Sequence, residues 1–295
     1  MMHLSVSGSS ELRFGLVGCR ISYSLSPLIH NAVFKKLNIN AVYDLVDIPE
    51  ENFDNVIVNL FEKYRGFNVT IPYKIRIVKY LTRLDVTATV VGAVNTVDIV
   101  SHSDRVGYNT DVIGIVKSLQ KVRKNLEGLR VLVLGAGGAA RAAIYAVHML
   151  GAGNICVVNR SLDRALELQK HFEKHGIKVS VEAWDKRNSI APEYDVIINC
   201  TPVGTQSNES PLSEGVFRKG QIVLDMVYRP RFTKLLRDAH RAGACIVDGL
   251  TVLVYQALAA DEIWLGVKVL TEDMYTYIMQ ILENEVPDSK LPDST

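Results

Sequence analysis

The chain has 295 residues, of which 48% are hydrophobic, and its formal net charge is +1 at pH 7. At roughly 150 residues per domain, this length suggests two domains, each with enough apolar residues for a core. The small net charge provides no attraction to nucleic acid or to a membrane surface. No stretch of about 18 apolar residues is present to predict a transmembrane helix.

The ends of the chain and the cysteines bear on location and metal content. The first ten residues lack a basic stretch followed by an apolar one, so they predict a short flexible lead and a cytoplasmic protein. The polar tail after Glu285 is expected to fray. The four cysteines are Cys19, Cys156, Cys200 and Cys245, and they form no C-x-x-C pair and no metal-ligand cluster. Three of the four lie in or beside apolar, strand-like runs. This arrangement favours buried free thiols and predicts no metal site.

The first predicted strand covers residues 12–17, and a helix is expected to begin at Ser26. A serine followed by Pro27 is a typical helix start, with the serine hydroxyl as N-cap. Ser24 and Ser26 can be explained as a turn and a cap without further role. Alternatively, two hydroxyls at the positive end of a helix form a natural carboxylate site.

A polar cluster is predicted after a further strand and helix, expected at residues 41–45 and 53–64. Pro72 keeps the preceding residue extended, so the next strand should end there and a helix should begin near Tyr73. We expect the apolar side of that helix to comprise Ile75, Val78 and Leu81. Asn68, Thr70 and Lys74 then meet at the carboxyl end of a strand, the edge where α/β folds bind ligands.

Two later segments place polar side chains where an apolar stretch stops. One is Gly92-Ala-Val-Asn-Thr96, which presents Asn95, and the other is Asn109-Thr-Asp111, which presents a carboxylate. A helix over residues 112–119 and a charged stretch over 121–128 follow, and they predict a domain boundary.

A glycine-rich turn begins the second half of the chain. Residues 131–134 predict a buried parallel strand, which ends at Gly135 and passes into a helical pattern. Gly135, Gly137 and Ala140 fit the G-x-G-x-x-G/A spacing of a dinucleotide fold, in which backbone N–H groups at the helix start receive a pyrophosphate.

The end of the next strand indicates which dinucleotide binds. That strand, residues 155–158, ends in Asn159-Arg-Ser161, where NAD enzymes carry an acidic residue for the ribose hydroxyl. Arg160, with Arg164 one helical turn further on, suits a 2′-phosphate instead. We therefore predict NADP over NAD; the alternative is a β-α-β unit that binds no nucleotide.

The remaining pattern continues this fold. Strands are predicted at 195–199, 222–226 and 244–247, with a helix over 233–242. The next helix, over 251–260, is apolar nearly all round, so we expect it to be buried between two bodies. Gln256 is its one large polar side chain and requires hydrogen-bond partners, from a ligand for example.

Together these motifs resemble those of shikimate dehydrogenases, over residues 14–256. The resemblance rests on eight segments in one order: Tyr23-Ser-Leu-Ser-Pro27, Asn68-Val-Thr-Ile-Pro-Tyr-Lys74, Gly92-Ala-Val-Asn-Thr96, Asn109-Thr-Asp111, the Gly135 turn, Asn159-Arg-Ser161, Asn199-Cys-Thr-Pro202 and Asp248-Gly-Leu250 with Gln256. It implies an α/β protein of two domains, with residues 1–111 as the substrate domain, completed by C-terminal helices in 250–295. Residues 112–249 would form a Rossmann-type NADP domain.

The resemblance also implies an activity and a set of site residues. The activity is the reversible reduction of 3-dehydroshikimate to shikimate with NADPH, in aromatic amino-acid biosynthesis, by a possible homodimer. Its catalytic pair matches Lys74 and Asp111. Substrate contacts match Ser24 and Ser26 for the carboxylate, Tyr228 near it, and Asn68, Thr70, Asn95, Asp111 and Gln256 for ring hydroxyls. Cofactor contacts match Gly135, Ala136, Gly137, Gly138, Ala139, Asn159, Arg160, Ser161, Arg164, Met226 and Gly249.

The chemistry requires a proton carrier. Hydride transfer at a secondary alcohol must accompany loss or gain of the hydroxyl proton, while a nicotinamide supplies the redox step. We hypothesise that Lys74 carries this proton to the C3 oxygen and that Asp111 holds Lys74. The alternative is a lysine that only binds substrate.

Two other functions stay open. Quinate/shikimate dehydrogenases that accept NAD place an aspartate at the position that Leu162 occupies here, which argues against that reading. A metabolite sensor on the same scaffold would be expected to lack Lys74 or Asp111, and both are present. Tyr23 stands where the family often has histidine, and we expect little consequence.

Overall fold

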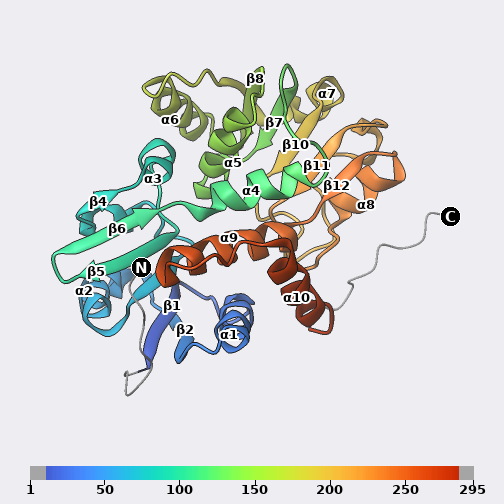
Figure 1. Ribbon diagram of the computed structural model, residues 1–295. Helices are drawn as coiled ribbons and strands as arrows, with labels where there is room; N and C mark the ends of the chain where they lie inside the picture. Colours follow the sequence, from blue (N-terminus) through green and yellow to red (C-terminus); the bar gives the residue numbers. More distant parts are fainter. Residues whose placement is uncertain (1–10, 286–295) are drawn as a thin grey trace.

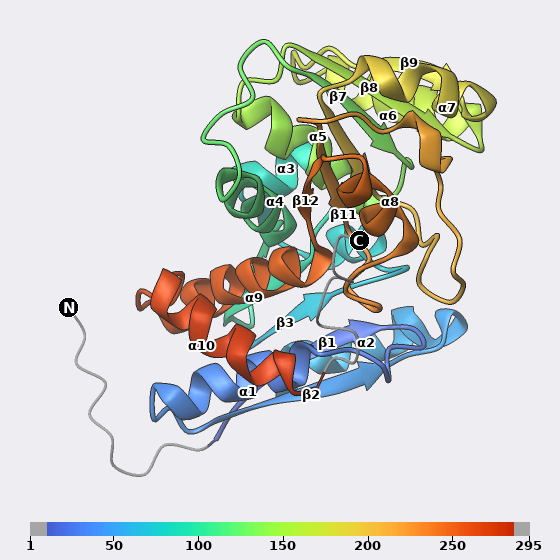
Figure 2. The same ribbon diagram turned by 90° about the vertical axis from the view of Figure 1, so that its right-hand side faces the viewer.

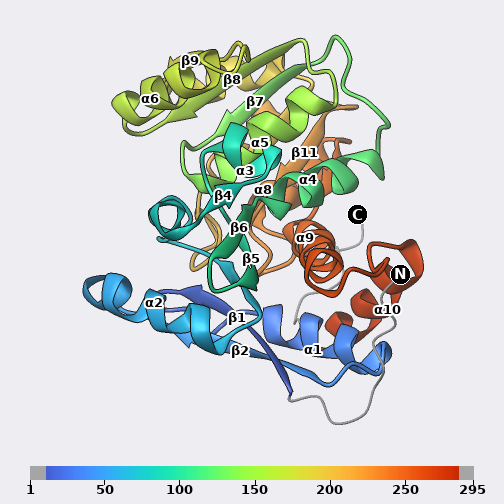
Figure 3. The same cartoon turned by 60° about the vertical axis from the view of Figure 1, so that its left-hand side comes forward.

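The computed structural model describes residues 11–285, so the predicted N-terminal lead and the tail after Glu285 lie outside the described residues. The chain forms two six-stranded sheets, each with helices on both faces (Figure 1). Between the sheets, helices α4 (Thr110–Gln120) and α9 (Gly249–Leu265) pack against each other, as Figure 3 shows from another side. The predicted α/β class is confirmed.

The first sheet is mixed, with the strand order β2-β1-β3-β5-β6-β4. Its first three strands are parallel, whereas β5 runs antiparallel to both of its neighbours, β3 and β6. The strands are β1 (Leu12–Gly18), β2 (Ala41–Asp47), β3 (Gly66–Val69), β4 (Arg83–Leu84), β5 (Thr96–Ser101) and β6 (Asp104–Tyr108). Its helices are α1 (Ser26–Lys36), α2 (Phe53–Lys63) and α3 (Val86–Val91), with the short 3₁₀ helices η1 (Glu50–Asn52) and η2 (Arg76–Tyr80).

Alternate residues of β1 face two separate cores, because successive strand side chains point to opposite sides of a sheet. Phe14 and Leu16 pack with α1, α9 and the last helix, α10 (Glu272–Glu283), whereas Val17 packs with α2. Figure 2 shows α9, α10 and α1 stacked over this face. The C-terminal helices therefore complete the core of the sheet that the N-terminal half begins.

The second sheet is entirely parallel, in the order β12-β11-β10-β7-β8-β9. Numbered along the chain, this is the 3-2-1-4-5-6 order of dinucleotide-binding folds, with the switch point between β7 and β10. The strands are β7 (Arg130–Leu134), β8 (Asn154–Asn159), β9 (Ser180–Ala183), β10 (Val196–Asn199), β11 (Ile222–Asp225) and β12 (Cys245–Val247). The helices are α5 (Gly138–Met149), α6 (Leu162–Glu173), α7 (Arg187–Ile190) and α8 (Lys234–Arg241), with the short 3₁₀ helices η3 (Trp184–Lys186), η4 (Ala191–Glu193) and η5 (Glu214–Val216).

The contact between α4 and α9 depends on Gly114. A Cβ at this position would lie 2.8 Å from the Val252 carbonyl oxygen and 3.0 Å from Gln256 Cβ. Neither neighbour is the free end of a flexible side chain, so only glycine permits this helix spacing. The predicted burial of the apolar C-terminal helix is confirmed, since most residues of α9 are buried.

We expect Gly114→Ala to lower the free energy of unfolding by about 1–3 kcal/mol, because the methyl group forces the two helices apart. Denaturant unfolding measures this change. Gly215→Ala is the matched control, since nothing lies within 4 Å of the added Cβ there. Equal stability of the two variants would show that the α4–α9 spacing adapts without cost.

The helix predicted near Tyr73 is wrong in position, and of its three expected core residues Ile75 is exposed, whereas Val78 and Leu81 are half-buried against the core. The chain turns after β3, with the Tyr73 N–H donating to the Thr70 carbonyl at 2.8 Å, and only η2 follows. The turn shifts the inward position, so Ile77 is fully buried and Ile75 is 54% exposed. Lys74 lies in this turn and not in the first turn of a helix.

The predicted N-cap is also wrong. Ile29 N–H donates to the Leu25 carbonyl, so Leu25 is the N-cap and Ser26 is the first residue of α1. The Ser24 hydroxyl accepts a hydrogen bond from the Ser26 N–H at 3.2 Å.

The cysteines and the helix lengths complete the comparison with the sequence. All four cysteines are free, but only Cys156 is buried; Cys19 and Cys200 are half-buried and Cys245 is exposed. The apolar run that Cys245 begins belongs to an edge strand, β12, which has a neighbour on one side only.

Within residues 11–285, no helix has the length and apolar character required to cross a bilayer.

Candidate active site

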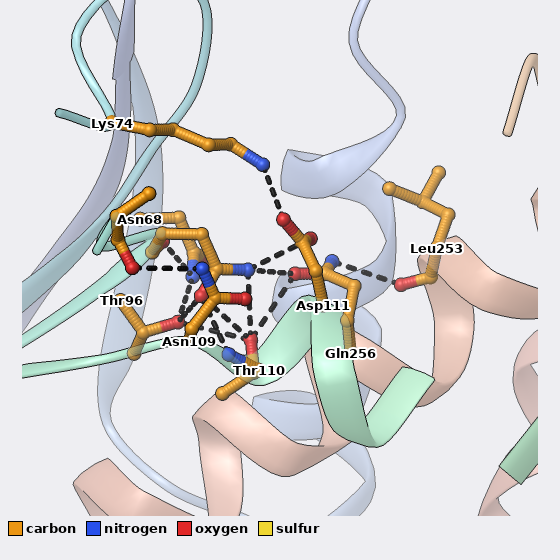
Figure 4. Close-up of polar contacts among 10 residues, drawn as sticks. Asn68, Lys74, Thr96, Asn109, Thr110, Asp111, Leu253 and Gln256 are labelled. Atoms are coloured by element: carbon orange, nitrogen blue, oxygen red, sulfur yellow. Dashed lines mark hydrogen bonds and ion pairs between the residues drawn. The ribbon is translucent and has the colours of Figure 1, made fainter. Parts of the chain in front are cut away.

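A lysine–carboxylate pair lies where the two sheets face each other. Lys74 comes from the turn after β3 and Asp111 from the first turn of α4, and Nζ lies 2.5 Å from Oδ2 (Figure 4). The start of a helix favours a carboxylate through its free N–H groups and dipole. The side chains are 17% and 9% exposed, so the pair is largely shielded from water.

Asn95 connects this pair to the two helices between the sheets, α4 and α9. Its Nδ2 lies 2.9 Å from Asp111 Oδ1, 3.0 Å from Thr110 Oγ1 and 3.2 Å from Gln256 Oε1. An amide nitrogen has two hydrogens, so it cannot satisfy three acceptors at once. Thr110 Oγ1 in addition hydrogen-bonds Thr96 and Gln256, so the acceptors around Asn95 form one connected network.

Asn68 lies deeper, with an exposed fraction of 4%. Its Nδ2 donates to the Asn95 carbonyl at 3.1 Å and to Thr96 Oγ1 at 2.9 Å, and its Oδ1 accepts from the Tyr43 hydroxyl at 2.7 Å. Both amide hydrogens are thus used within the protein. A ligand hydroxyl can reach Asn68 only through the remaining acceptor capacity of Oδ1.

The other predicted substrate residues form a second group. Ser24 Oγ and Ser26 Oγ are 3.2 Å apart, and burial raises the pKa of Tyr228 to about 12, an effect that Ser24 opposes by hydrogen bonding. Tyr228 follows β11, so this group joins the two halves of the chain. Thr70 belongs to neither group, because its hydroxyl makes no hydrogen bond within the part of the chain that the structure describes.

Three residues of the polar network were not predicted as site residues. Thr96 and Thr110 each lie beside a predicted residue, so their place in the two asparagine motifs was a usable signal. Tyr43 had no such signal, because tyrosine in an apolar strand is an ordinary strand residue.

The glycine-rich turn has the shape needed by a pyrophosphate. Gly135 has φ +110°, and a Cβ there would lie 3.2 Å from the Cys200 carbonyl group. Gly137 faces open space, and α5 begins at Gly138 without a side-chain cap, so its first N–H groups remain available. A Cβ on Gly138 would lie 3.4 Å from Lys74 Cδ, which places the lysine stem beside this helix start.

The residues predicted to select NADP lie at the end of β8. Arg160 and Arg164 are exposed, and neither guanidinium makes a hydrogen bond or ion pair with any other residue among 11–285. Asn159 and Ser161 do have local roles, since Asn159 Nδ2 donates to the Ser161 carbonyl at 2.8 Å and Ser161 caps α6. Two free guanidinium groups at this edge fit a phosphate well.

The last predicted cofactor residues lie along the same edge of the sheet. Met226 directly follows β11, and its N–H donates to the Asn199 carbonyl at 2.9 Å. Gly249 begins α9 so close to this strand end that a Cβ would lie 2.5 Å from the Val227 carbonyl oxygen. Both residues therefore lie at the carboxyl end of β11, where the backbone of α9 begins in close contact with it.

A buried carboxylate fixes the loop after β10. Asp225 accepts from Asn199 Nδ2 at 2.9 Å, and Asn199 Oδ1 in turn accepts from the N–H and hydroxyl of Thr201. Burial raises the pKa of the Asp225 carboxyl to about 6, against hydrogen bonds from Thr233, Val227 and Asn199 that lower it.

We expect Asp225 to make the fold less stable as pH rises from about 4 to about 6. The carboxyl pKa is about 3.9 in an unfolded chain and higher in the fold, so the folded state binds the proton more tightly. The resulting stabilisation is complete below pH ~4 and disappears above pH ~6, a change of about 3 kcal/mol. Denaturant unfolding of wild type and Asp225→Asn at several pH values measures it. A difference between the two that does not vary with pH would contradict this assignment.

The fold and the site together define a class of protein. A sheet in dinucleotide-binding order, facing a second α/β unit with a lysine–carboxylate pair at the junction, is typical of nucleotide-dependent oxidoreductases. Residues 16–97 match the family described as shikimate dehydrogenase substrate binding domain, and residues 117–225 match shikimate / quinate 5-dehydrogenase. The chain belongs to the shikimate dehydrogenase family.

Individual relatives agree with this assignment. Shikimate dehydrogenase (NADP(+)) of Saccharolobus solfataricus is 39% identical over 265 residues, which cover 90% of this chain and 93% of the relative. The crystal structure of shikimate dehydrogenase from Aquifex aeolicus has a TM-score of 0.84 at 32% identity, covering 93% of this chain and 100% of the other. The crystal structure of the Thermus thermophilus enzyme in complex with NADP(H) and shikimate has a TM-score of 0.80 at 31% identity. The match covers 91% of this chain and 99% of the other.

Proposed function

We propose that this protein is an NADP-dependent shikimate dehydrogenase, which catalyses the reversible reduction of 3-dehydroshikimate to shikimate. The observation that carries the proposal is the Lys74–Asp111 pair beside the first turn of α5. The proposed proton carrier and the proposed dinucleotide-binding helix start thereby lie side by side. The solved relative with NADP(H) and shikimate supports the same combination of ligands.

Each of the two sheets belongs to a domain with its own proposed function. We assign residues 1–111 and 250–295 to substrate binding and catalysis, and residues 112–249 to NADP binding. Packing of α9 and α10 on the first sheet supports this assignment. A homodimer and a cytoplasmic location remain predictions from the sequence.

The cofactor side would use backbone and cations. The turn from Gly135 to Ala139 would receive the pyrophosphate, and Arg160 and Arg164 the 2′-phosphate, with Asn159 and Ser161 shaping that edge. Met226 and Gly249 would line the nicotinamide end. When bound, NADP supplies hydride transfer.

The substrate side would use the two polar groups. Ser24, Ser26 and Tyr228 would bind the carboxylate, while Asn68, Thr70, Asn95 and Gln256 would bind ring hydroxyls. Lys74 would give a proton to the C3 oxygen in reduction and take one in oxidation. Asp111 would hold the Lys74 ammonium group through Oδ2 and bind a neighbouring substrate hydroxyl.

The test is turnover, followed by the absorbance of the reduced nicotinamide. Purified protein is assayed with shikimate and with quinate, each with NADP and with NAD. Turnover with shikimate and NADP, and little with the other combinations, is expected. Turnover with quinate or NAD would move the assignment to the broader quinate/shikimate enzymes, and NADP binding without any turnover would favour a sensor.

A further inference from the structure

We propose that Tyr43 is a positioning residue for shikimate binding, acting through its hydroxyl on Asn68. The inference rests on the proposed function and adds a residue that makes no substrate contact of its own. Tyr43 lies in β2, is 2% exposed and donates to Asn68 Oδ1 at 2.7 Å. It therefore lies beneath the site.

The hydrogen bond from Tyr43 helps decide how the Asn68 amide faces. The other side of that amide donates to the Asn95 carbonyl at 3.1 Å and to Thr96 Oγ1 at 2.9 Å. Donors on one side and acceptors on the other fix the amide in one orientation. Without the phenol, Asn68 Oδ1 becomes a buried acceptor with no protein donor, and the side chain loses one of the contacts that hold it still.

Tyr43 is itself held from two directions. Its backbone N–H and carbonyl both hydrogen-bond to the Asn31 side chain of α1, at 2.9 and 3.1 Å. Its ring stacks on His30, with 4.1 Å between the ring centroids and an interplanar angle of 10°. His30 is in turn fixed by Asp261 of α9, 2.7 Å from Nδ1 to Oδ1, and both of these side chains are fully buried. The phenol thus has a fixed position before any ligand arrives.

The phenol lies between the two groups of predicted substrate residues. Burial raises the pKa of Tyr43 well above its ordinary value, so the hydroxyl remains a donor, and hydrogen bonding with Ser26 acts in the opposite direction. Ser26 is one of the residues predicted to bind the substrate carboxylate, and Asn68 is one of those predicted to bind its ring hydroxyls. Among residues 11–285 these two groups share no direct hydrogen bond, and the hydroxyl of Tyr43 reaches the ring-hydroxyl residues through Asn68 Oδ1.

Kinetics of Tyr43→Phe test the proposal, because this change removes the hydroxyl and keeps the ring stacked on His30. We expect the KM for shikimate to rise about 3- to 10-fold, as for loss of one buried hydrogen bond, with kcat and the KM for NADP within about two-fold of wild type. Tyr275→Phe is the matched control. It also has a stacked ring and a hydroxyl bonded to a side chain, on α10. It should leave the KM for shikimate unchanged.

A double-variant cycle shows whether Tyr43 acts through Asn68. In an Asn68→Ala background, Tyr43→Phe should have no further effect on the KM for shikimate. An equal rise in both backgrounds, or an unchanged KM in a folded Tyr43→Phe enzyme, would overturn the proposal.

The remaining outcomes are equally informative. If Tyr43→Phe does not fold, Asn68→Ala still tests the inference, because an unchanged KM for shikimate in that variant would overturn it. If the wild type turns over shikimate and the variants have the same kinetic constants as the wild type, only the inference is overturned. A wild type without shikimate turnover overturns the proposed function and the inference with it.

Discussion

Lys74→Ala should lower kcat for shikimate oxidation by about 100-fold or more, with little change in the KM for shikimate. General acid–base catalysis typically contributes about 10²- to 10⁴-fold, and the Nζ of Lys74 is the only ammonium group that contacts Asp111 among residues 11–285. Steady-state kinetics with saturating NADP measures both constants.

Lys79→Ala is the control for this change. Lys79 follows in η2, is 59% exposed and pairs with Asp54 on the surface, so its loss should leave both constants unchanged. A Lys74→Ala enzyme with normal kcat and a raised KM would instead identify Lys74 as a residue that only binds substrate.

Arg160→Ala should raise the KM for NADP by about 10- to 100-fold and leave the much weaker use of NAD unchanged. A charge-assisted hydrogen bond is worth about 1.5–3 kcal/mol, and the 2′-phosphate is the only part of NADP that NAD lacks. The free guanidinium of Arg160 at the end of β8 makes the residue available for that contact. Initial rates at varied NADP and varied NAD, at constant ionic strength, measure the change in preference.

Arg83→Ala controls for the loss of a surface cation, since Arg83 is 58% exposed and pairs with Asp104 on the first sheet. It should not alter the KM for either nucleotide. If Arg160→Ala also leaves the NADP preference intact, Arg164 becomes the residue to change next, and the sequence argument at Asn159-Arg160 is refuted.

The parallel half of the fold was readable from the sequence. Its strands are continuous apolar runs because both faces of the sheet are covered by helices, and its glycine turn has a fixed spacing. The strands of the first sheet are harder to predict from the sequence, since this sheet mixes parallel and antiparallel pairs. The turn at Tyr73 was mistaken for a helix because an apolar period of three or four residues also fits a turn followed by a short 3₁₀ helix.

The sequence by itself determined the chemistry that is available. Lys74, Asp111, the glycine turn and Arg160 were each identifiable from residue type and local position, because strand ends, helix starts and tight turns depend on nearby residues. These signals predict a phosphate-binding edge and a polar cluster at strand ends, whereas the reductase activity and the role of Lys74 as proton carrier are implied by the resemblance to shikimate dehydrogenases.

Only the tertiary structure decided which polar atoms meet. Asn95 and Gln256 are 161 positions apart, yet they share a hydrogen bond, and Gly114 lets α4 approach α9, the helix that carries Gln256. Tyr43 and Asn68 meet through strands that lie on either side of β1. A hydrogen bond depends on distance and angle within tenths of an ångström, and local sequence patterns cannot supply that information.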